Sequence, residues 1–214
     1  MLGLSSNKIA SETGLEKPRV LSRALNRTRE VMLRDIPGVF EGTVEVDETY
    51  IGGQWRNKRK AHRVQGTKRG RGTSKQPVFG ILCRHGYVWA EIVPGVDSET
   101  LVPLINKRVR RGSIIYSDTW RGYTGIAAKG YVHRLVEHTK GEFSDTRGTH
   151  INGLEGFWGY LKRNLASKGG IRQERLPLYL AEYVWRFNHR NCTIDEQIKT
   201  LLKLLYNYNQ IHKN

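Results

Sequence analysis

The stretch "VEVDETYIGG", residues 44–53, places a carboxylate at the centre of a predicted core strand. Apolar and β-branched residues alternate with polar ones along it, which is typical of a β-strand with one face in the core. Asp47 lies in the middle of this run. A buried carboxylate is costly unless it is paired, hydrogen-bonded or bound to a metal, so Asp47 is the first candidate functional residue.

The two other acids of the stretch fall on different faces of the strand. Because side chains alternate, Glu45 shares the face of Asp47 and Glu48 points the opposite way. Glu45 is placed to assist a metal or to pair with a nearby arginine, and we favour the salt bridge.

The segments that follow predict a mixed α/β fold. Residues 77–93 alternate around "RHG" as a β-hairpin, and further strands are predicted near 113–118 and 131–139. Helical periodicity and capping residues predict helices over 97–109, 150–165, 176–191 and 193–206. Strands interleaved with helices favour a mixed sheet flanked by helices over a sandwich or a bundle.

Three acids stand out as a possible metal site. Asp47 lies in the first strand, Asp118 ends a later strand, and Glu155 lies near the start of a helix. Mg²⁺ prefers oxygen ligands and is commonly held by a few carboxylates together with substrate phosphates. Lys162 follows Glu155 by two helical turns, so both project from one side of the helix, where a lysine is placed to hold a phosphate.

Basic residues dominate two other parts of the chain. Residues 5–33 predict two helices around a turn at Gly14, the outline of a helix-turn-helix that would present Arg19 and Arg23 to DNA; an ordinary helical hairpin is the alternative. Residues 54–77 contain glycines and nine basic residues without an acid, as expected of a loop that orders along a phosphate backbone. The candidate phosphate contacts in this loop are Lys58, Arg59, Lys60, Lys68, Arg69 and Arg71.

Composition narrows the class of partner and the compartment. The 214 residues include 36 Lys and Arg against 20 Asp and Glu, a net charge of +16, which favours a nucleic-acid partner. We expect no membrane segment, because no apolar run approaches the length of a span. Two cysteines without a CxxC pair argue against a disulfide framework or a cysteine zinc site, and predict a cytoplasmic protein.

Three blocks of the sequence resemble the DDE transposases of bacterial insertion sequences, in the group with an ISXO-like transposase domain. They are "VEVDETYIGG", "YSDTWRGY" and "HINGLEGFWGYLKRNL…YLAEYVWRFNHRN", in that order. The resemblance implies a ribonuclease-H-like fold, two-metal strand cleavage and strand transfer with Mg²⁺ or Mn²⁺, and at least a dimer on double-stranded DNA from element ends and target. Asp47 and Asp118 match the first two catalytic aspartates of the family.

The third catalytic residue has two candidates. We prefer Glu155 as metal ligand, because it is charged, its spacing from Asp118 suits the pattern, and Lys162 follows. Asn152 is the alternative, and Asn152 with Glu155 also matches a capping box, which would make both residues structural. We expect Lys162 and Arg163 to contact DNA.

The sequence therefore predicts a metal-dependent transposase in three parts. These are a helix-turn-helix over 1–36, a ribonuclease-H-like catalytic domain over 40–190, and a C-terminal helix over 191–214. Many relatives also carry a cysteine zinc ribbon, which this sequence lacks. Two rival functions follow: a DNA-binding remnant or regulator without catalysis, and a ribonuclease-H-like nuclease.

Overall fold

The computed structural model describes residues 6–15, 18–52, 75–84, 86–118, 121–123, 125–136, 152–168 and 171–211. The six candidate phosphate contacts of the basic loop lie outside these residues. The chain forms two compact units, one of residues 37–177 and one that joins residues 1–36 to residues 178–214. The domain boundaries expected from the sequence differ from these units, because they group residues 178–190 with the sheet and treat residues 191–214 as a separate part. The division of the chain into functional domains stays a prediction.

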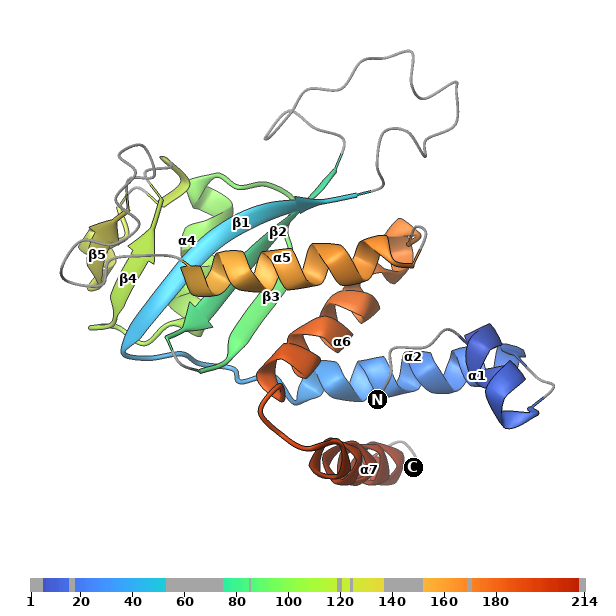
Figure 1. The fold of residues 1–214 in the computed structure, drawn as a ribbon. Coiled ribbons are helices and arrows are strands. Elements are labelled where there is room, and N and C mark those ends of the chain that lie inside the picture. Colours follow the sequence, from blue (N-terminus) through green and yellow to red (C-terminus); the bar gives the residue numbers. More distant parts are fainter. Residues whose placement is uncertain are drawn as a thin grey trace, which may run out of the picture. The chain divides into compact units, whose positions relative to one another are not determined.

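The first unit is built on a five-stranded mixed sheet (Figure 1). Its strands are β1 (Thr43–Ile51), β2 (Gln76–Cys83), β3 (Val88–Ile92), β4 (Ile114–Ser117) and β5 (Val132–Leu135). The order across the sheet is β3-β2-β1-β4-β5. The first three strands pair antiparallel, whereas β4 runs parallel to β1 and β5 parallel to β4. This topology confirms the predicted mixed α/β, ribonuclease-H-like fold class.

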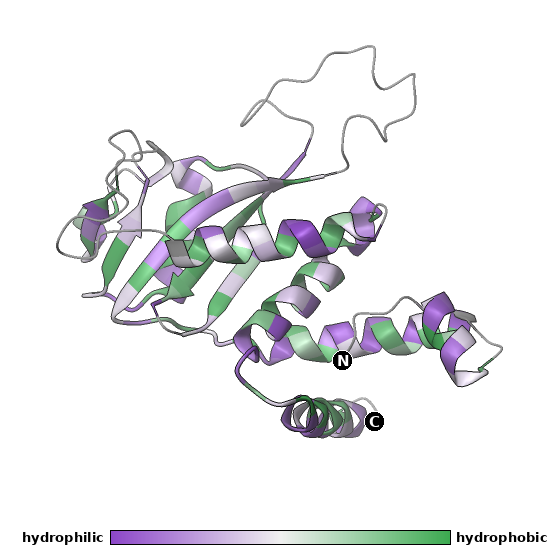
Figure 2. Ribbon diagram, viewed as in Figure 1, coloured by the Kyte–Doolittle hydropathy of each residue, from purple (hydrophilic) through white to green (hydrophobic). Residues whose placement is uncertain are grey.

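Two helices cover opposite faces of the sheet. α5 (Asn152–Ala166) packs on β1 and β2 and lies in front of the sheet in Figure 1. α4 (Ser98–Arg108) lies behind it, where the Arg108 guanidinium stacks 4.7 Å from the centre of the Trp89 ring. Much of the apolar sequence lies in the strands between these helices, as the green stretches of β2 and β3 show (Figure 2).

Short 3-10 helices complete the connections of this unit. They are η3 (Arg121–Tyr123), η4 (Ala127–Lys129) and η6 (Gln173–Arg175).

The second unit is helical and is assembled from both ends of the chain. It contains α1 (Ser6–Thr13), α2 (Pro18–Arg34), most of α6 (Leu176–Asn188), and α7 (Ile194–Ile211). Met32, Trp185 and Leu201 form its buried cluster. At the start of α7, Thr193 and Glu196 exchange hydrogen bonds of 2.7 and 3.3 Å as a reciprocal cap.

The two N-terminal helices expected from the sequence are present. Gly14, between α1 and α2, has a positive φ of 68°, which glycine adopts without strain. Their use as a DNA-binding helix-turn-helix remains a prediction. None of the helices in the described ranges is long and apolar enough to cross a membrane.

Candidate active site

The sheet brings Asp47 and Asp118 together. β1 and β4 pair in parallel with Thr43 opposite Ile114 and Glu45 opposite Tyr116. The ladder ends at Glu45 and Tyr116; continued by two residues, the same offset puts Asp118, the first residue after β4, level with Asp47 on β1, and the charge of Asp118 contributes to the raised pKa of Asp47. Residues at matching positions of paired strands share a face, so the two carboxylates belong to the α5 face of the sheet.

Asp47 occupies an environment that opposes its charge. Burial is the main cause that raises the pKa of Asp47, to about 7, and the neighbouring Glu48 and Asp118 act in the same direction. A hydrogen bond of 2.9 Å from the Trp158 indole Nε1 to Asp47 Oδ2 works against this shift. The site therefore holds an acidic group that a cation would stabilise.

Asp118 is held at the end of β4 by its neighbours. The Ser117 hydroxyl donates a hydrogen bond of 2.8 Å to the Asp118 carbonyl, and it also lies 2.7 Å from His133 Nε2 on β5. These contacts fix the backbone from which the Asp118 side chain projects.

Glu48 follows the alternation expected of it. Its Oε2 accepts a 2.7 Å hydrogen bond from the hydroxyl of Tyr123, which is fully buried. Burial raises the pKa of Tyr123 well above its usual value, and the charges of Glu48, Asp47 and Asp118 add to the shift. The charges of Glu48, Asp47 and Asp118 thus influence the same region, although Glu48 lies on the opposite face of the sheet from Asp47.

Glu45 connects the sheet to α5 rather than joining Asp47. Its Oε2 accepts a hydrogen bond of 3.0 Å from the Leu154 backbone N–H, and its Oε1 lies 3.4 Å from Arg84 Nε. The salt bridge favoured from the sequence is confirmed. A carboxylate at the first turn of a helix also interacts favourably with the helix dipole.

α5 carries the remaining predicted residues of the site. Lys162 is exposed, and partial burial of its side chain and the charge of Lys75 lower its pKa, whereas the charge of Asp47 raises it. Glu155 and Arg163 are exposed. The side chain of Asn152 lies outside the described residues, although its backbone begins the helix.

The described residues contain no group of three His, Cys, Asp or Glu side chains that could hold a metal ion. The structure thus brings Asp47 and Asp118 together with Lys162 nearby, and it does not add Glu155 to them as a third ligand. The oxygen chemistry of the two aspartates fits Mg²⁺. Glu155 and Asn152 stay predictions for the third position.

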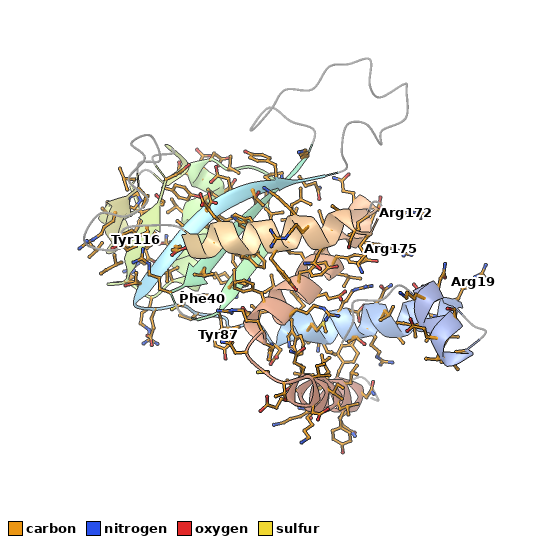
Figure 3. All side chains as sticks on the ribbon, in the orientation of Figure 1. Arg19, Phe40, Tyr87, Tyr116, Arg172 and Arg175 are labelled. Atoms are coloured by element: carbon orange, nitrogen blue, oxygen red, sulfur yellow. The ribbon has the colours of Figure 1, made fainter. Side chains whose placement is uncertain are left out.

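The arginines predicted to contact DNA on α2 are exposed. Arg19 projects from the start of the helix, as Figure 3 shows, and Arg23 is exposed one turn later. Arg29 on the same helix is different: it is buried, with its Nε 2.8 Å from Glu182 Oε2 and its guanidinium over the Tyr179 ring.

Comparison with known proteins identifies the family. The model of the ISXO2-like transposase domain matches residues 39–188, which include β1, β4, α5 and both aspartates. The chain belongs to this family. The resemblance expected from the three sequence blocks is therefore confirmed.

One relative and two solved structures are also similar to this chain. An uncharacterized transposase-like protein of Haemophilus influenzae is 38% identical over 118 residues, which are 55% of this chain and 93% of the relative. The catalytic core domain of BIV integrase has a TM-score of 0.44 and 15% identity, over 73% of this chain and 89% of that one. A chain of the simian T-cell lymphotropic virus intasome with the PP2A regulatory subunit B56 gamma has a TM-score of 0.43 and 13% identity, over 72% and 50% of the respective chains.

The sequence does not indicate two residues that lie at the candidate site. Trp158 is buried on α5, as expected of a large apolar side chain, yet its indole N–H reaches Asp47. Its position between Glu155 and Lys162 on the helix was the available signal. Gly80 lies opposite Asp47 on β2, and only the pairing of β1 with β2 shows this.

Proposed function

We propose that this protein is a metal-dependent DNA transposase that cleaves and joins DNA strands at Asp47 and Asp118. The observation that carries the proposal is the juxtaposition of these two aspartates, with Lys162 nearby, in a chain of the ISXO2-like transposase family. Asp47 and Asp118 would hold Mg²⁺ or Mn²⁺, with Glu155 as the preferred third ligand and Asn152 as the alternative. A pair of such ions activates an attacking oxygen and stabilises the leaving oxygen of a phosphodiester.

The reaction would proceed in two displacements at phosphorus. In the first, water attacks a phosphodiester at the element end, and the P–O3′ bond breaks to leave a 3′-OH. In the second, that 3′-OH attacks a target phosphodiester, a new P–O bond forms, and the target 3′-oxygen leaves. Positioning and charge stabilisation supply most of the rate in such reactions.

The chain's own residues would bind and orient the DNA. Lys162, whose pKa responds to the charge of Asp47, would hold a phosphate near the reacting bond. Arg163 and the exposed Arg19 and Arg23 would bind the backbone further along, together with the basic loop. Cleavage at two element ends would require at least two copies of the chain on DNA.

Calorimetric titration with Mn²⁺, with and without a DNA duplex, tests the metal site. We expect Asp47→Asn and Asp118→Asn to abolish binding, and Glu155→Gln to do so if it is the third ligand. Asn152→Ala would show the loss instead if Asn152 is that ligand. Glu91→Gln, an exposed acid on β3, is the matched control.

A joining assay then separates the rival functions. The donor is a duplex that carries the inverted repeats flanking the gene, and the target is a supercoiled plasmid. A transposase joins the donor 3′ end to the plasmid in the presence of Mn²⁺. Cleavage of RNA–DNA hybrids without joining would indicate a nuclease, and DNA binding in EDTA without cleavage in Mn²⁺ would indicate a regulator.

A further inference from the structure

The Trp158 side chain spans the gap between α5 and the sheet and ends at the Asp47 carboxylate. The indole is 4% exposed, and its Nε1 donates a hydrogen bond of 2.9 Å to Asp47 Oδ2. The outer torsion of an aspartate is broad, so a carboxylate without a fixed donor has a loosely defined orientation. Hydrogen bonds to charged groups are stronger than those between neutral groups. This bond therefore restricts the orientation of Asp47.

Gly80 leaves the space in which the indole lies. It is directly opposite Asp47 in the β1–β2 register. A Cβ at this position would lie 2.6 Å from Trp158 Cζ2 and 2.7 Å from Cη2. Real Cβ atoms do not approach so closely, so any larger residue would displace the ring. A glycine within a strand commonly marks such a close approach.

A second hydrogen bond from β1 sets the position of α5 along the strand. Glu45 accepts from the Leu154 backbone N–H at 3.0 Å, two residues before Asp47 on the same face. Leu154 and Trp158 are one helical turn apart. The helix is thus held to β1 at two points, and the direction of the indole toward Asp47 follows from the fixed register of α5.

We propose that Trp158 is a positioning residue for the Asp47 carboxylate and that Gly80 is required because it admits the indole. This inference rests on the proposed function, in which Asp47 is a metal ligand. Groups that hydrogen-bond to ligating carboxylates orient them, and their loss costs about 10–100-fold in metal affinity. Trp158 would act through Asp47 without touching the DNA or the reacting atoms.

Three variants of the full-length protein separate the hydrogen bond from the packing. Trp158→Phe removes the N–H together with the outer ring atoms that lie over Gly80. Gly80→Ala keeps the indole but displaces it. The double variant Gly80→Ala/Trp158→Phe puts a methyl group where the outer ring atoms were, which restores packing without restoring the hydrogen bond. Trp89→Phe, at a buried tryptophan on the opposite face, is the control for the loss of an indole.

Mn²⁺ affinity, measured by calorimetry with a DNA duplex present, is the main readout. We expect both single variants and the double variant to bind about 10–100-fold more weakly than the parent, while Trp89→Phe binds as the parent does. Recovery of affinity in the double variant would overturn the positioning role, because the indole would then matter only for packing. Unchanged affinity in Trp158→Phe would overturn it as well.

The indole N–H resonance provides a readout without metal. In ¹H–¹⁵N spectra of the metal-free protein, the Nε1–H signal that disappears in Trp158→Phe should shift in Asp47→Ala and keep its position in Glu91→Gln. A signal unaffected by Asp47→Ala would contradict the bond. If the parent binds no Mn²⁺ even with DNA, the proposed function fails and this inference fails with it. If the parent binds Mn²⁺ and Trp158→Phe binds it equally well, only the inference is overturned.

Discussion

At the residue scale, the site holds a carboxylate under unfavourable conditions. Asp47 is half-buried and lies near two other acids, with the Trp158 N–H as a compensating donor. Proteins retain such destabilising groups where function requires them. The cost should therefore be measurable in the stability of the metal-free protein.

Asp47→Asn should stabilise the protein against unfolding in EDTA at about pH 8. The aspartate is charged there in an environment that raises its pKa, and asparagine removes the charge. We expect the free energy of unfolding to rise by about 1–3 kcal/mol, a value that is discounted for the partial exposure of the carboxylate. Chemical denaturation of parent and variant measures it, with Glu91→Gln as the control. A loss of stability would show that the carboxylate is well compensated in the folded protein.

Glu182, in the helical unit, has a pKa shifted in the opposite direction to that of Asp47, so its effect on stability has the opposite dependence on pH. Burial tends to raise the pKa of Glu182, but Arg186 and Arg29 outweigh burial and hold it below the usual value of 4.5. A lowered pKa means that the charged carboxylate contributes stability above its unfolded pKa, and that this contribution is lost as the pH falls through the folded pKa.

Glu182→Gln should consequently destabilise the protein at neutral pH by about 3 kcal/mol, because it removes the charged partner of the buried Arg29 and the half-buried Arg186. The difference from the parent should shrink on acidification. Thermal unfolding followed by circular dichroism across the acid range tests this, with the exposed Glu174→Gln as the control. A difference that stays constant with pH would argue against the charge interaction.

At the element scale, α5 links the fold to the site. Its first turn meets the Glu45 carboxylate of β1, its middle reaches Asp47 through Trp158, and its last turns carry Lys162 and Arg163. The close approach depends on small residues where helix and sheet touch.

Two glycines of α5 should respond in opposite directions to the same substitution. A Cβ at Gly153 would lie 3.0 Å from Leu82 Cδ2 and 3.1 Å from Glu45 Oε2, whereas one at Gly156 would meet nothing within 4 Å. We expect Gly153→Ala to destabilise by about 1–3 kcal/mol through overpacking. Gly156→Ala should stabilise by about 0.5–1 kcal/mol, because alanine favours the helix. Denaturant midpoints of the two variants compare them directly, and equal shifts would contradict the close contact at Gly153.

At the scale of the whole molecule, the two ends of the chain share a core. Met32 from α2 packs with Trp185 from α6 and Leu201 from α7. The Trp185 indole also donates a 2.8 Å hydrogen bond to Asp35 Oδ2. The N-terminal helices therefore depend on the C-terminal segment for their stability.

Leu201→Ala should loosen the helical unit without loosening the sheet. Removing a fully buried leucine side chain costs about 2–5 kcal/mol. We expect faster hydrogen exchange at the backbone amides of α2 and α6, and unchanged exchange in β1 and β2. Leu202→Ala is the matched control, because the adjacent leucine is 62% exposed. Equal effects of the two changes would show that Leu201 is not a core residue.

The sequence by itself determined the main helices and strands and the position of Asp47 within one of those strands. Period-two alternation marked β1 with Asp47 at its centre, and helical periodicity and capping residues marked α5 and α7, because these signals depend on neighbours along the chain. The family blocks also led to the correct family.

Only the tertiary structure decided which residues meet. Asp118 reaches Asp47 through parallel strand pairing, Trp158 reaches Asp47 across the space left by Gly80, and α7 joins α2 in one core. Each contact joins residues far apart in the sequence, and local patterns carry no information about the register or the packing that creates it. The partners of Asp47 are therefore a property of the fold, whereas its place in a buried strand can be predicted from ten residues.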